Sequence, residues 1–341
     1  MDILRKLSIN LVLIALGFAI AFFVFEYAVR FTYPKFDPSG HIHFTESADG
    51  VVLVKKHGLQ RQVKNTGDYD VTVYINKLGL RERKNLADAK PTDYFVVGDS
   101  FSFGWGVEEK NRYSNKLQRI LRNHKIFNIS TTTNFSGYDR LIKYSRKNGA
   151  NIKNLIIGVC MENDLRYYGL KEESTPKKGE QNPLRKFISL ATIKTYLTSN
   201  SAAYFFITSI IQNTKWLKNI AVKVGVITPN LHGINYHSFD IDLIKSSVQK
   251  LREISAPFNT IVLIIPSRAL WVGRKEKRRA TDQTHNVFVN LVRNQGIKVV
   301  DPRMHMESTN NPLNFHFKND GHWNETAHSL AASMLAKTIK Q

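Results

Sequence analysis

The sequence of 341 residues contains a single cysteine, Cys160. One cysteine excludes an intramolecular disulfide framework and a zinc site built on cysteine pairs. Ten prolines and nineteen glycines exclude a collagen-like chain, and a content of 42% hydrophobic and 23% charged residues excludes a largely disordered one. The length therefore allows one large α/β domain with additional segments, or two small domains.

Acidic residues are also scarce: 28 Asp and Glu stand against 49 Lys and Arg, a formal net charge of +21. Such an excess indicates an anionic partner, which can be nucleic acid, a membrane surface or an acidic polymer. The densest basic cluster, residues 274–279, is interpreted as a solvated face, with contact to anionic lipid head groups or an acidic glycan as the alternative. No nucleic-acid-binding motif accompanies the charge, so nucleic acid is not expected as a partner.

Charge is absent from Leu7 to Phe25. As a helix these residues span about 28 Å, close to the hydrocarbon thickness of a bilayer. Arg5 and Lys6 precede the apolar run, so the positive-inside rule predicts a cytoplasmic N-terminus. We predict an uncleaved membrane anchor over residues 1–35, with a transmembrane helix at about 7–28, and a single-pass protein whose remaining chain is periplasmic or extracellular.

Two alternatives to the anchor stay open. A cleaved signal peptide is one, because Ala19-Ile20-Ala21 resembles a cleavage site, although the apolar run continues through Phe25. A buried helix of a soluble domain is the other. The anchor and the signal peptide both place the rest of the chain outside the cytoplasm.

After a β-rich lead-in over residues 36–90, short apolar strands alternate with amphipathic helices. This alternation predicts an α/β fold with a doubly wound parallel sheet, and a site at the carboxyl ends of its strands. The expected strands are 94–97, 126–129, 155–160, 260–265 and 297–300, and the expected helices are 113–123, 138–149, 241–254, 282–295 and 325–340.

Residues 165–235 interrupt this alternation with a polar loop at 172–182 and an aromatic, helical stretch at 184–217. We interpret the segment as a packed helical insertion. A lid over the site or an element that leans on the membrane is the alternative.

Polar residues follow the expected strands at three places. Ser100 comes after the first strand, Asn163 comes after another, and Asp320 and His322 precede the last helix. A serine nucleophile needs a base to take its proton and an acid to orient that base, and these residue types supply both.

Four short blocks in this order resemble the SGNH (GDSL) hydrolases: Gly98-Asp99-Ser100, Gly137 within residues 135–138, Asn163-Asp164, and Asp320 with His322. The resemblance covers roughly residues 70–340. It implies a flavodoxin-like three-layer α/β/α sandwich over residues 91–341, and no metal or cofactor. It further implies Ser100 as nucleophile, His322 as general base, Asp320 as its orienting acid, an oxyanion hole made of the Ser100 and Gly137 backbone N–H groups and the Asn163 amide, and supporting roles for Asp99 and Asp164.

The sequence departs from the family pattern at two positions. Met161 stands where the family often has glycine, and Asn319 stands where it often has the triad acid. Asp320, two residues before the histidine, has a spacing associated with membrane-bound and secreted relatives that modify polysaccharides. Asp301, or a dyad without an acid, remains an alternative to Asp320.

The remaining histidines are not expected to act. His41, His43 and His57 lack the clustered carboxylates of a metal site, and His316 and His328 are interpreted as non-catalytic. Cys160 is interpreted as a buried strand residue.

Three functions are compatible with these residues. The first is a serine esterase that cleaves an acyl or acetyl ester, with an acidic polysaccharide or a glycolipid as the ester-bearing substrate. The second is an O-acyltransferase that uses the same triad to acylate an envelope polysaccharide. The third is an inactive binding module of the cell envelope, which the complete set of blocks disfavours.

Overall fold

The computed structural model describes residues 2–38, 41–169, 196–225, 234 and 238–341. The chain divides into two compact units. The smaller comprises Met1–His41, Asn65–Gly67 and Lys177–Ile227, and the larger comprises the rest of the chain. The polar loop expected at 172–182 lies outside the described residues. The same holds for residues 184–195 of the helical stretch expected at 184–217.

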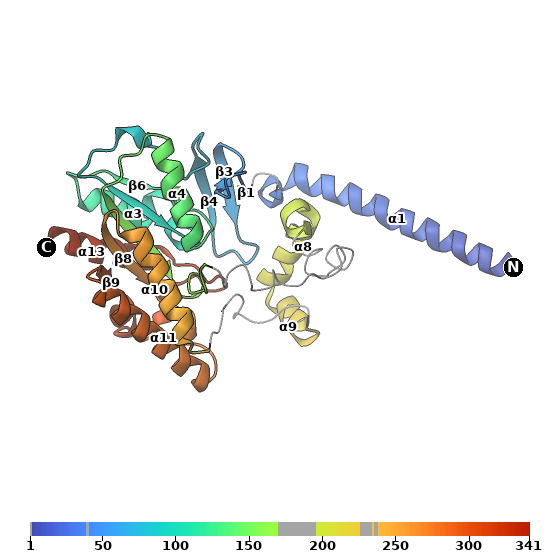
Figure 1. Ribbon diagram of the computed structural model, residues 1–341. Helices are drawn as coiled ribbons and strands as arrows, with labels where there is room; N and C mark the ends of the chain where they lie inside the picture. Colours follow the sequence, from blue (N-terminus) through green and yellow to red (C-terminus); the bar gives the residue numbers. More distant parts are fainter. Residues whose placement is uncertain (1, 39–40, 170–195, 226–233, 235–237) are drawn as a thin grey trace. The chain divides into compact units, whose positions relative to one another are not determined.

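The larger unit is built on a five-stranded parallel sheet in the order β6-β5-β7-β8-β9 (Figure 1). Numbered along the chain, this is the flavodoxin-like order 2-1-3-4-5, in which ligands bind at the switch point between β5 and β7. Each strand overlaps one that the sequence predicts. The bounds are β5 (Tyr94–Gly98), β6 (Ile126–Asn128), β7 (Asn154–Cys160), β8 (Asn259–Ile265) and β9 (Lys298–Val300).

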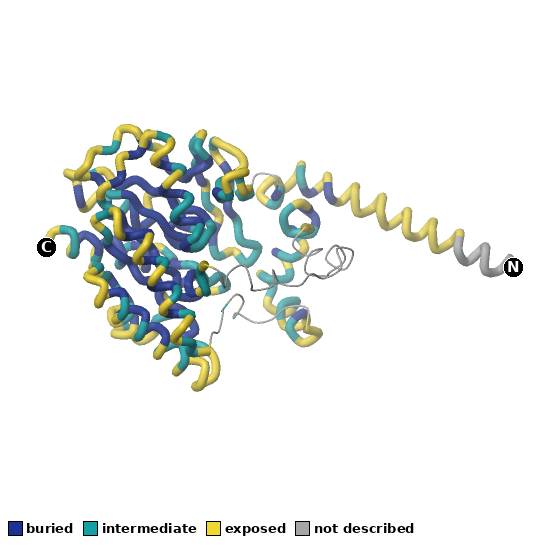
Figure 2. The backbone as a smooth tube through the Cα atoms, viewed as in Figure 1, coloured by how far each residue is buried: buried dark blue, intermediate teal, exposed yellow. Residues whose placement is uncertain are grey.

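Helices cover both faces of this sheet. Alternate side chains of β5 enter different layers, because Phe95 and Val97 pack in one core cluster and Val96 in the other. Helices α4, α10 and α11 cover the first face and α3 and α13 the second, and the strands between them are buried (Figure 2). The predicted three-layer α/β/α sandwich is confirmed. The bounds are α3 (Tyr113–Ile120), α4 (Phe135–Lys147), α10 (Ile241–Ser255), α11 (Lys275–Asn294) and α13 (Glu325–Lys340).

Helix α11 begins at Lys275, earlier than the sequence pattern predicts from residue 282. Its first turns lack the apolar residues by which a buried helix face is recognised, since residues 274–279 are basic or acidic and exposed. The basic cluster is thus the solvent-exposed start of a helix.

Two antiparallel hairpins form the β-rich lead-in, and the second carries Val73 and Ile75 into a small cluster with Phe103. Short helical turns connect the larger elements. The hairpin strands are β1 (Phe44–Glu46), β2 (Val52–Val54), β3 (Gly58–Val63) and β4 (Asp70–Ile75), and the short helices are α2 (Ser100–Phe103), α12 (Arg303–Glu307), η3 (Leu86–Asp88), η4 (Glu109–Asn111), η5 (Arg268–Leu270) and η6 (Pro312–Phe315).

The described residues of the smaller unit are mostly helical. Its stretch Ile9–Thr32 is long and apolar enough to cross a membrane, and nearly all of it is exposed, unlike a core helix (Figure 2). The predicted apolar N-terminal helix is therefore present. The bounds are α1 (Asp2–Thr32), η1 (Pro34–Phe36), α8 (Ala202–Asn213) and α9 (Lys215–Lys223).

Candidate active site

Ser100 is the first residue of α2, directly after the central strand β5. The Asp99 side chain caps this turn by accepting a hydrogen bond from the Phe101 N–H at 3.0 Å. A Cβ atom at Gly98 or Gly158 would lie 2.2 or 2.1 Å from the Ser102 Oγ. Glycine at both strand positions is what lets α2 pack directly on the sheet and hold Ser100 at the carboxyl end of β5.

Three polar side chains form a continuous chain at this edge of the sheet. The Ser100 Oγ lies 2.8 Å from the His322 Nε2, and the His322 Nδ1 lies 2.5 Å from the Asp320 Oδ1. The backbone N–H of His322 donates to the same carboxylate oxygen at 3.0 Å. If Nδ1 carries the proton that it donates to Asp320, Nε2 is free to accept the proton of Ser100. The structure thus brings together all three residues that sequence predicts as a triad.

The second oxygen of Asp320 has partners that the sequence motifs do not reveal. Lys64 Nζ lies 2.9 Å from Asp320 Oδ2, and the Tyr69 hydroxyl donates to the same oxygen at 3.2 Å. Trp105 Nε1 in turn donates to the Tyr69 hydroxyl at 2.6 Å. Burial favours protonation of Asp320, but the hydrogen bonds and charges of His322 and Lys64 hold the pKa of this carboxyl well below its ordinary value. Asp320 is therefore ionised throughout the neutral range.

Aromatic rings hold the His322 imidazole. Trp105 stacks on it with ring centroids 5.5 Å apart and planes inclined at 24°, and Phe101 packs at 5.0 Å. Gly106, with φ +77°, brings the chain close enough to Tyr69 that a Cβ would lie 2.6 Å from its ring. This packing restricts rotation of the imidazole away from Ser100.

The Asn163-Asp164 block lies at the end of β7. The Asn163 amide donates to Asp99 Oδ2 at 3.2 Å, which links this block to the residue before Ser100. Asp164 accepts hydrogen bonds from the Tyr138 hydroxyl at 2.9 Å and from the Cys160 N–H at 2.7 Å. Burial, together with the nearby Asp99 charge, raises the pKa of Asp164 well above its ordinary value. Asp99 and Asp164 therefore both hold loops of the site.

Gly137 lies in the first turn of α4, one residue before Tyr138. Its N–H is 3.4 Å from the Asn134 Oδ1, the side chain that caps this helix. A Cβ at Gly137 would lie 1.8 Å from the Thr133 Oγ1, so only glycine fits. Tyr138 connects this turn to Asp164, and through it to the rest of the blocks.

Asp301, the alternative triad acid, pairs with a different histidine. Its Oδ2 lies 2.8 Å from the His285 Nε2, and its Oδ1 accepts the Arg303 N–H at 3.0 Å. Asp301 is thus engaged away from His322.

The other histidines of interest are buried. Burial, followed by the charges of nearby arginines, lowers the pKa of both His316 and His328 to about 3, so both rings are neutral at pH 7. Within the described parts of the chain, no group of three or more His, Cys, Asp or Glu side chains is placed to hold a metal ion. Cys160 is buried in β7, as its strand context predicts.

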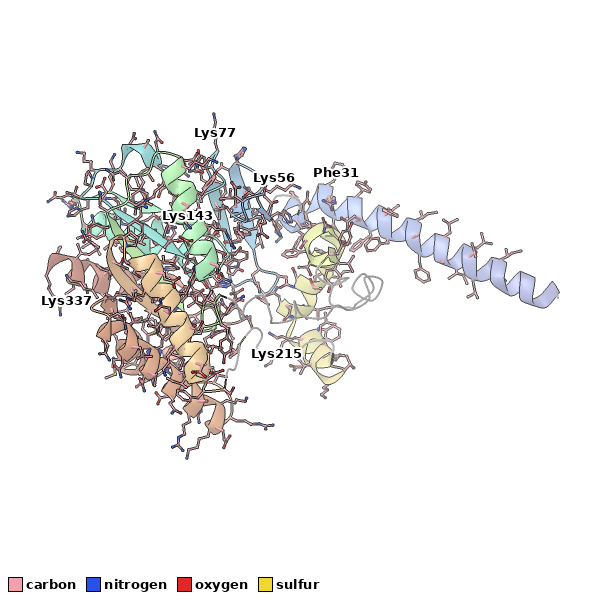
Figure 3. The ribbon with its side chains drawn as sticks, viewed as in Figure 1. Phe31, Lys56, Lys77, Lys143, Lys215 and Lys337 are labelled. Carbon is pink, nitrogen blue, oxygen red and sulfur yellow. The ribbon has the colours of Figure 1, made fainter. Side chains whose placement is uncertain are left out.

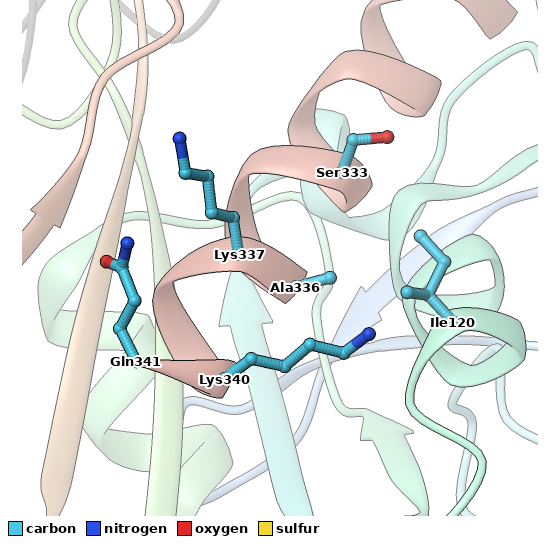
Figure 4. A pocket seen from close by; sticks show the side chains of 6 residues that line it. All are labelled: Ile120, Ser333, Ala336, Lys337, Lys340 and Gln341. Atoms are coloured by element: carbon cyan, nitrogen blue, oxygen red, sulfur yellow. The ribbon is translucent and has the colours of Figure 1, made fainter.

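A pocket of about 570 Å³ lies beside the triad and includes Asp320, Lys318 and Arg268 in its lining. Arg268 is nearly buried and pairs with Glu162 at 3.1 Å. Its guanidinium would lie 2.4 Å from a Cβ at Gly321, so any side chain between the acid and the base would require Arg268 to shift. A second hollow of about 430 Å³, between the last turns of α13 and the end of α3, contains none of the site residues (Figure 4).

A serine, a histidine and an aspartate joined in this order at the carboxyl edge of a parallel sheet are the arrangement of a serine hydrolase. Residues 245–341, which contain Asp320 and His322, match the family of the SGNH hydrolase-like domain of the acetyltransferase AlgX. The resemblance to the SGNH hydrolases is confirmed by this match. No curated protein matches the chain.

Three solved structures, of a lipolytic protein, an acetylxylan esterase and a lipase/acylhydrolase, are similar to this chain at low identity. A lipolytic protein of the G-D-S-L family from Veillonella parvula is 10% identical with a TM-score of 0.43, over 73% of this chain and 98% of that one. A catalytic mutant of the acetylxylan esterase Axe2 from Geobacillus stearothermophilus is 10% identical with a TM-score of 0.41, over 75% and 97%. A lipase/acylhydrolase from Enterococcus faecalis is 13% identical with a TM-score of 0.39, over 73% and 95%.

Proposed function

We propose that this protein is a membrane-anchored serine esterase that cleaves acyl or acetyl esters through an acyl-enzyme on Ser100. The observation that carries the proposal is the hydrogen-bonded chain from the Ser100 Oγ through both nitrogens of His322 to Asp320. The SGNH hydrolase-like match over residues 245–341 supports it.

Each step of the reaction moves one proton through His322. The Ser100 Oγ attacks the ester carbonyl carbon while the His322 Nε2 takes its proton, which gives a tetrahedral oxyanion and an imidazolium beside Asp320. Collapse breaks the bond to the alcohol oxygen, and that oxygen takes the proton from His322. Water then attacks the acyl-enzyme, giving its proton to Nε2, and the carboxylic acid leaves as Ser100 regains a proton.

The oxyanion needs hydrogen-bond donors that point at the former carbonyl oxygen. We assign the Ser100 and Gly137 backbone N–H groups and the Asn163 amide to this role. Asn163 supports the assignment because its amide carries two N–H bonds and the contact with Asp99 uses one of them. Removing one such donor typically lowers the rate by about 10²–10³.

An acidic polysaccharide or a glycolipid is the substrate class that we favour. The net charge of +21 attracts polyanions, and Lys318 and Arg268 line the pocket next to Asp320. The apolar Ile9–Thr32 stretch, preceded by Arg5 and Lys6, supports a single-pass anchor with a cytoplasmic N-terminus and an extracytoplasmic catalytic unit.

O-acyl transfer is the second candidate, and one observation favours it: the matching family is described as that of an acetyltransferase. The chemistry differs only in the second half, where a sugar hydroxyl replaces water as the group that attacks the acyl-enzyme. The proton of that hydroxyl passes to the His322 Nε2, as the proton of water does in hydrolysis.

Ester cleavage by the full chain in detergent tests the proposal. p-Nitrophenyl acetate and longer esters are offered to wild type, to Ser100→Ala and to the control Ser308→Ala, which alters an exposed serine in the turn after α12. We expect Ser100→Ala to lower p-nitrophenol release by at least about 10³-fold, and Ser308→Ala to leave it unchanged. Equal release by wild type and Ser100→Ala would contradict the proposal, and acetylated product on an added polysaccharide would identify transfer.

A further inference from the structure

Helix α9 of the smaller unit presents an apolar row that none of the unit's described residues covers. Trp216, Ile220 and Val224 follow at intervals of four residues along α9 and its C-terminal end, and their exposed fractions are 63%, 51% and 67%. Helices of soluble domains bury such a row against a core. A row of this kind left exposed marks an interaction surface.

A basic row runs beside the apolar one. Lys215, Asn219 and Lys223 each directly precede one residue of the apolar row. Both lysines are exposed (Figure 3 labels Lys215). Lys218 adds a third positive charge, and α9 contains no acidic residue. An apolar face beside lysines is the pattern of a helix that lies in the plane of a membrane surface, where lysine stems reach toward head groups.

Helix α8 leads into α9, and its first turn is hydrogen-bonded to the C-terminal part of α1. The Glu26 carboxylate of α1 accepts hydrogen bonds from the N–H groups of Ala202 and Ala203, both at 2.9 Å, and from the Ser201 Oγ at 2.7 Å. Glu26 therefore supplies partners for the free N–H groups of the first turn of α8. Arg30 supports the same junction, because it donates to Glu26 at 2.8 Å and to the carbonyl of Asn200, two residues before α8, at 2.6 Å.

Aromatic side chains complete this junction. The ring of Phe206 in α8 lies 6.1 Å from Phe25 and 4.9 Å from Phe36, and it stacks on Tyr33 at 5.5 Å. The start of α8 is thus held by both polar and aromatic contacts at the last turns of α1 and the turn that follows.

The position of this junction along α1 corresponds to the bilayer surface. About twenty helical residues cross the hydrocarbon layer. Counted from Leu7, they end near Glu26, the first charged residue after the apolar run. Tyr27 and Phe31 follow with exposed fractions of 58% and 83%, as expected of interfacial aromatic residues (Figure 3 labels Phe31).

We propose that α8 and α9 form a second membrane contact on the leaflet surface from which α1 emerges. Trp216, Ile220 and Val224 enter the boundary between head groups and acyl chains, and the three lysines contact anionic lipid. This inference rests on the proposed membrane anchor. It assigns the bilayer, rather than a protein, as the occupant of the exposed face of α9.

Depth-dependent fluorescence quenching in nanodiscs tests it with the full chain. In a Cys160→Ala background, single cysteines replace Trp216, Leu16 in the apolar run, and Met304, which is 78% exposed in the larger unit. Each carries an environment-sensitive dye, and the lipids carry nitroxides either near the head group or at mid-chain. We expect the dye at 216 to be quenched by the shallow nitroxide at least twofold more than the dye at 304, and the dye at 16 to be quenched by the deep one.

Anionic lipid gives the second readout. With 30% phosphatidylglycerol, shallow quenching at position 216 should exceed that in phosphatidylcholine alone, and Lys215→Gln/Lys218→Gln/Lys223→Gln or high salt should reduce it. Quenching at 16 without quenching at 216 overturns the inference and leaves the anchor intact. Loss of quenching at 16 overturns the anchor itself. Protection of the dye at 216 from aqueous quencher without lipid quenching would assign the face to a second copy of the chain.

Discussion

Two aspartate–histidine pairs in the larger unit have the same chemistry and different surroundings. Asp320 and His322 approach to 2.5 Å, and Asp301 and His285 approach to 2.8 Å. The His322 side chain is 23% exposed and its second nitrogen faces Ser100, whereas the His285 side chain is 2% exposed. The second nitrogen of His285 finds no partner among the described residues. An acid–histidine pair becomes a catalytic base only where its far nitrogen meets a nucleophile at an accessible edge.

The largest expected effect separates the two histidines. His322→Gln removes the group that carries the proton, so kcat/KM for p-nitrophenyl acetate should fall by about 10⁴-fold or more. His285→Gln leaves Ser100 and its base untouched, so kcat/KM should stay within about twofold while Tm falls. Steady-state kinetics and thermal unfolding of both variants check this. Loss of activity in His285→Gln with an unchanged Tm would reverse the assignment of the pairs.

A smaller effect is expected from the partners that only Asp320 has. Lys64→Met and Tyr69→Phe each remove one contact to its second oxygen, and each should lower kcat/KM by about 3–10-fold. Both contacts fix the orientation of the carboxylate that holds His322, so the loss is one of positioning. Lys64→Arg keeps a positive charge beside Asp320 and should restore most of the activity. Equal losses in Lys64→Arg and Lys64→Met would show that Lys64 acts through packing alone.

The smallest effect on activity is expected at Asp301. Burial favours its protonation, but the hydrogen bond and charge of His285 lower the pKa of this carboxyl below its ordinary value. A carboxyl with a lowered folded pKa stabilises the fold above its unfolded pKa of about 3.9 and loses that contribution as the pH falls further. Asp301→Asn should therefore lower Tm at pH 7, and the difference from wild type should shrink below about pH 4. A Tm difference that grows with acid would contradict this sign.

The strands and helices of the larger unit are predictable from local patterns. Apolar runs such as 155–160 and 260–265 have no other stable place than a covered sheet, and each forms the strand expected of it. The pattern fails at the start of α11, where residues 275–281 carry no apolar face and reveal their helix only through the residues that follow.

The site divides in the same way. Ser100, Asn163, Asp320 and His322 are predictable because each stands in a short motif next to an expected strand or helix. Lys64 and Tyr69 belong to no motif, and Tyr69 meets Asp320 across 251 positions of the chain. The alternating pattern predicts a β-rich lead-in over residues 36–90. It predicts neither the hairpin of β3 and β4 nor where that hairpin packs.

The sequence by itself determined the α/β alternation, the apolar N-terminal helix and the residue types of a serine triad. These depend on composition and on spacing along a few turns of chain, which act before any distant contact forms. The tertiary structure decided which aspartate accepts the hydrogen bond of His322 and which side chains contact that aspartate. It also decided that the Glu26 side chain caps the N-terminus of α8. Those choices depend on distances between segments far apart in the chain, and packing alone sets such distances.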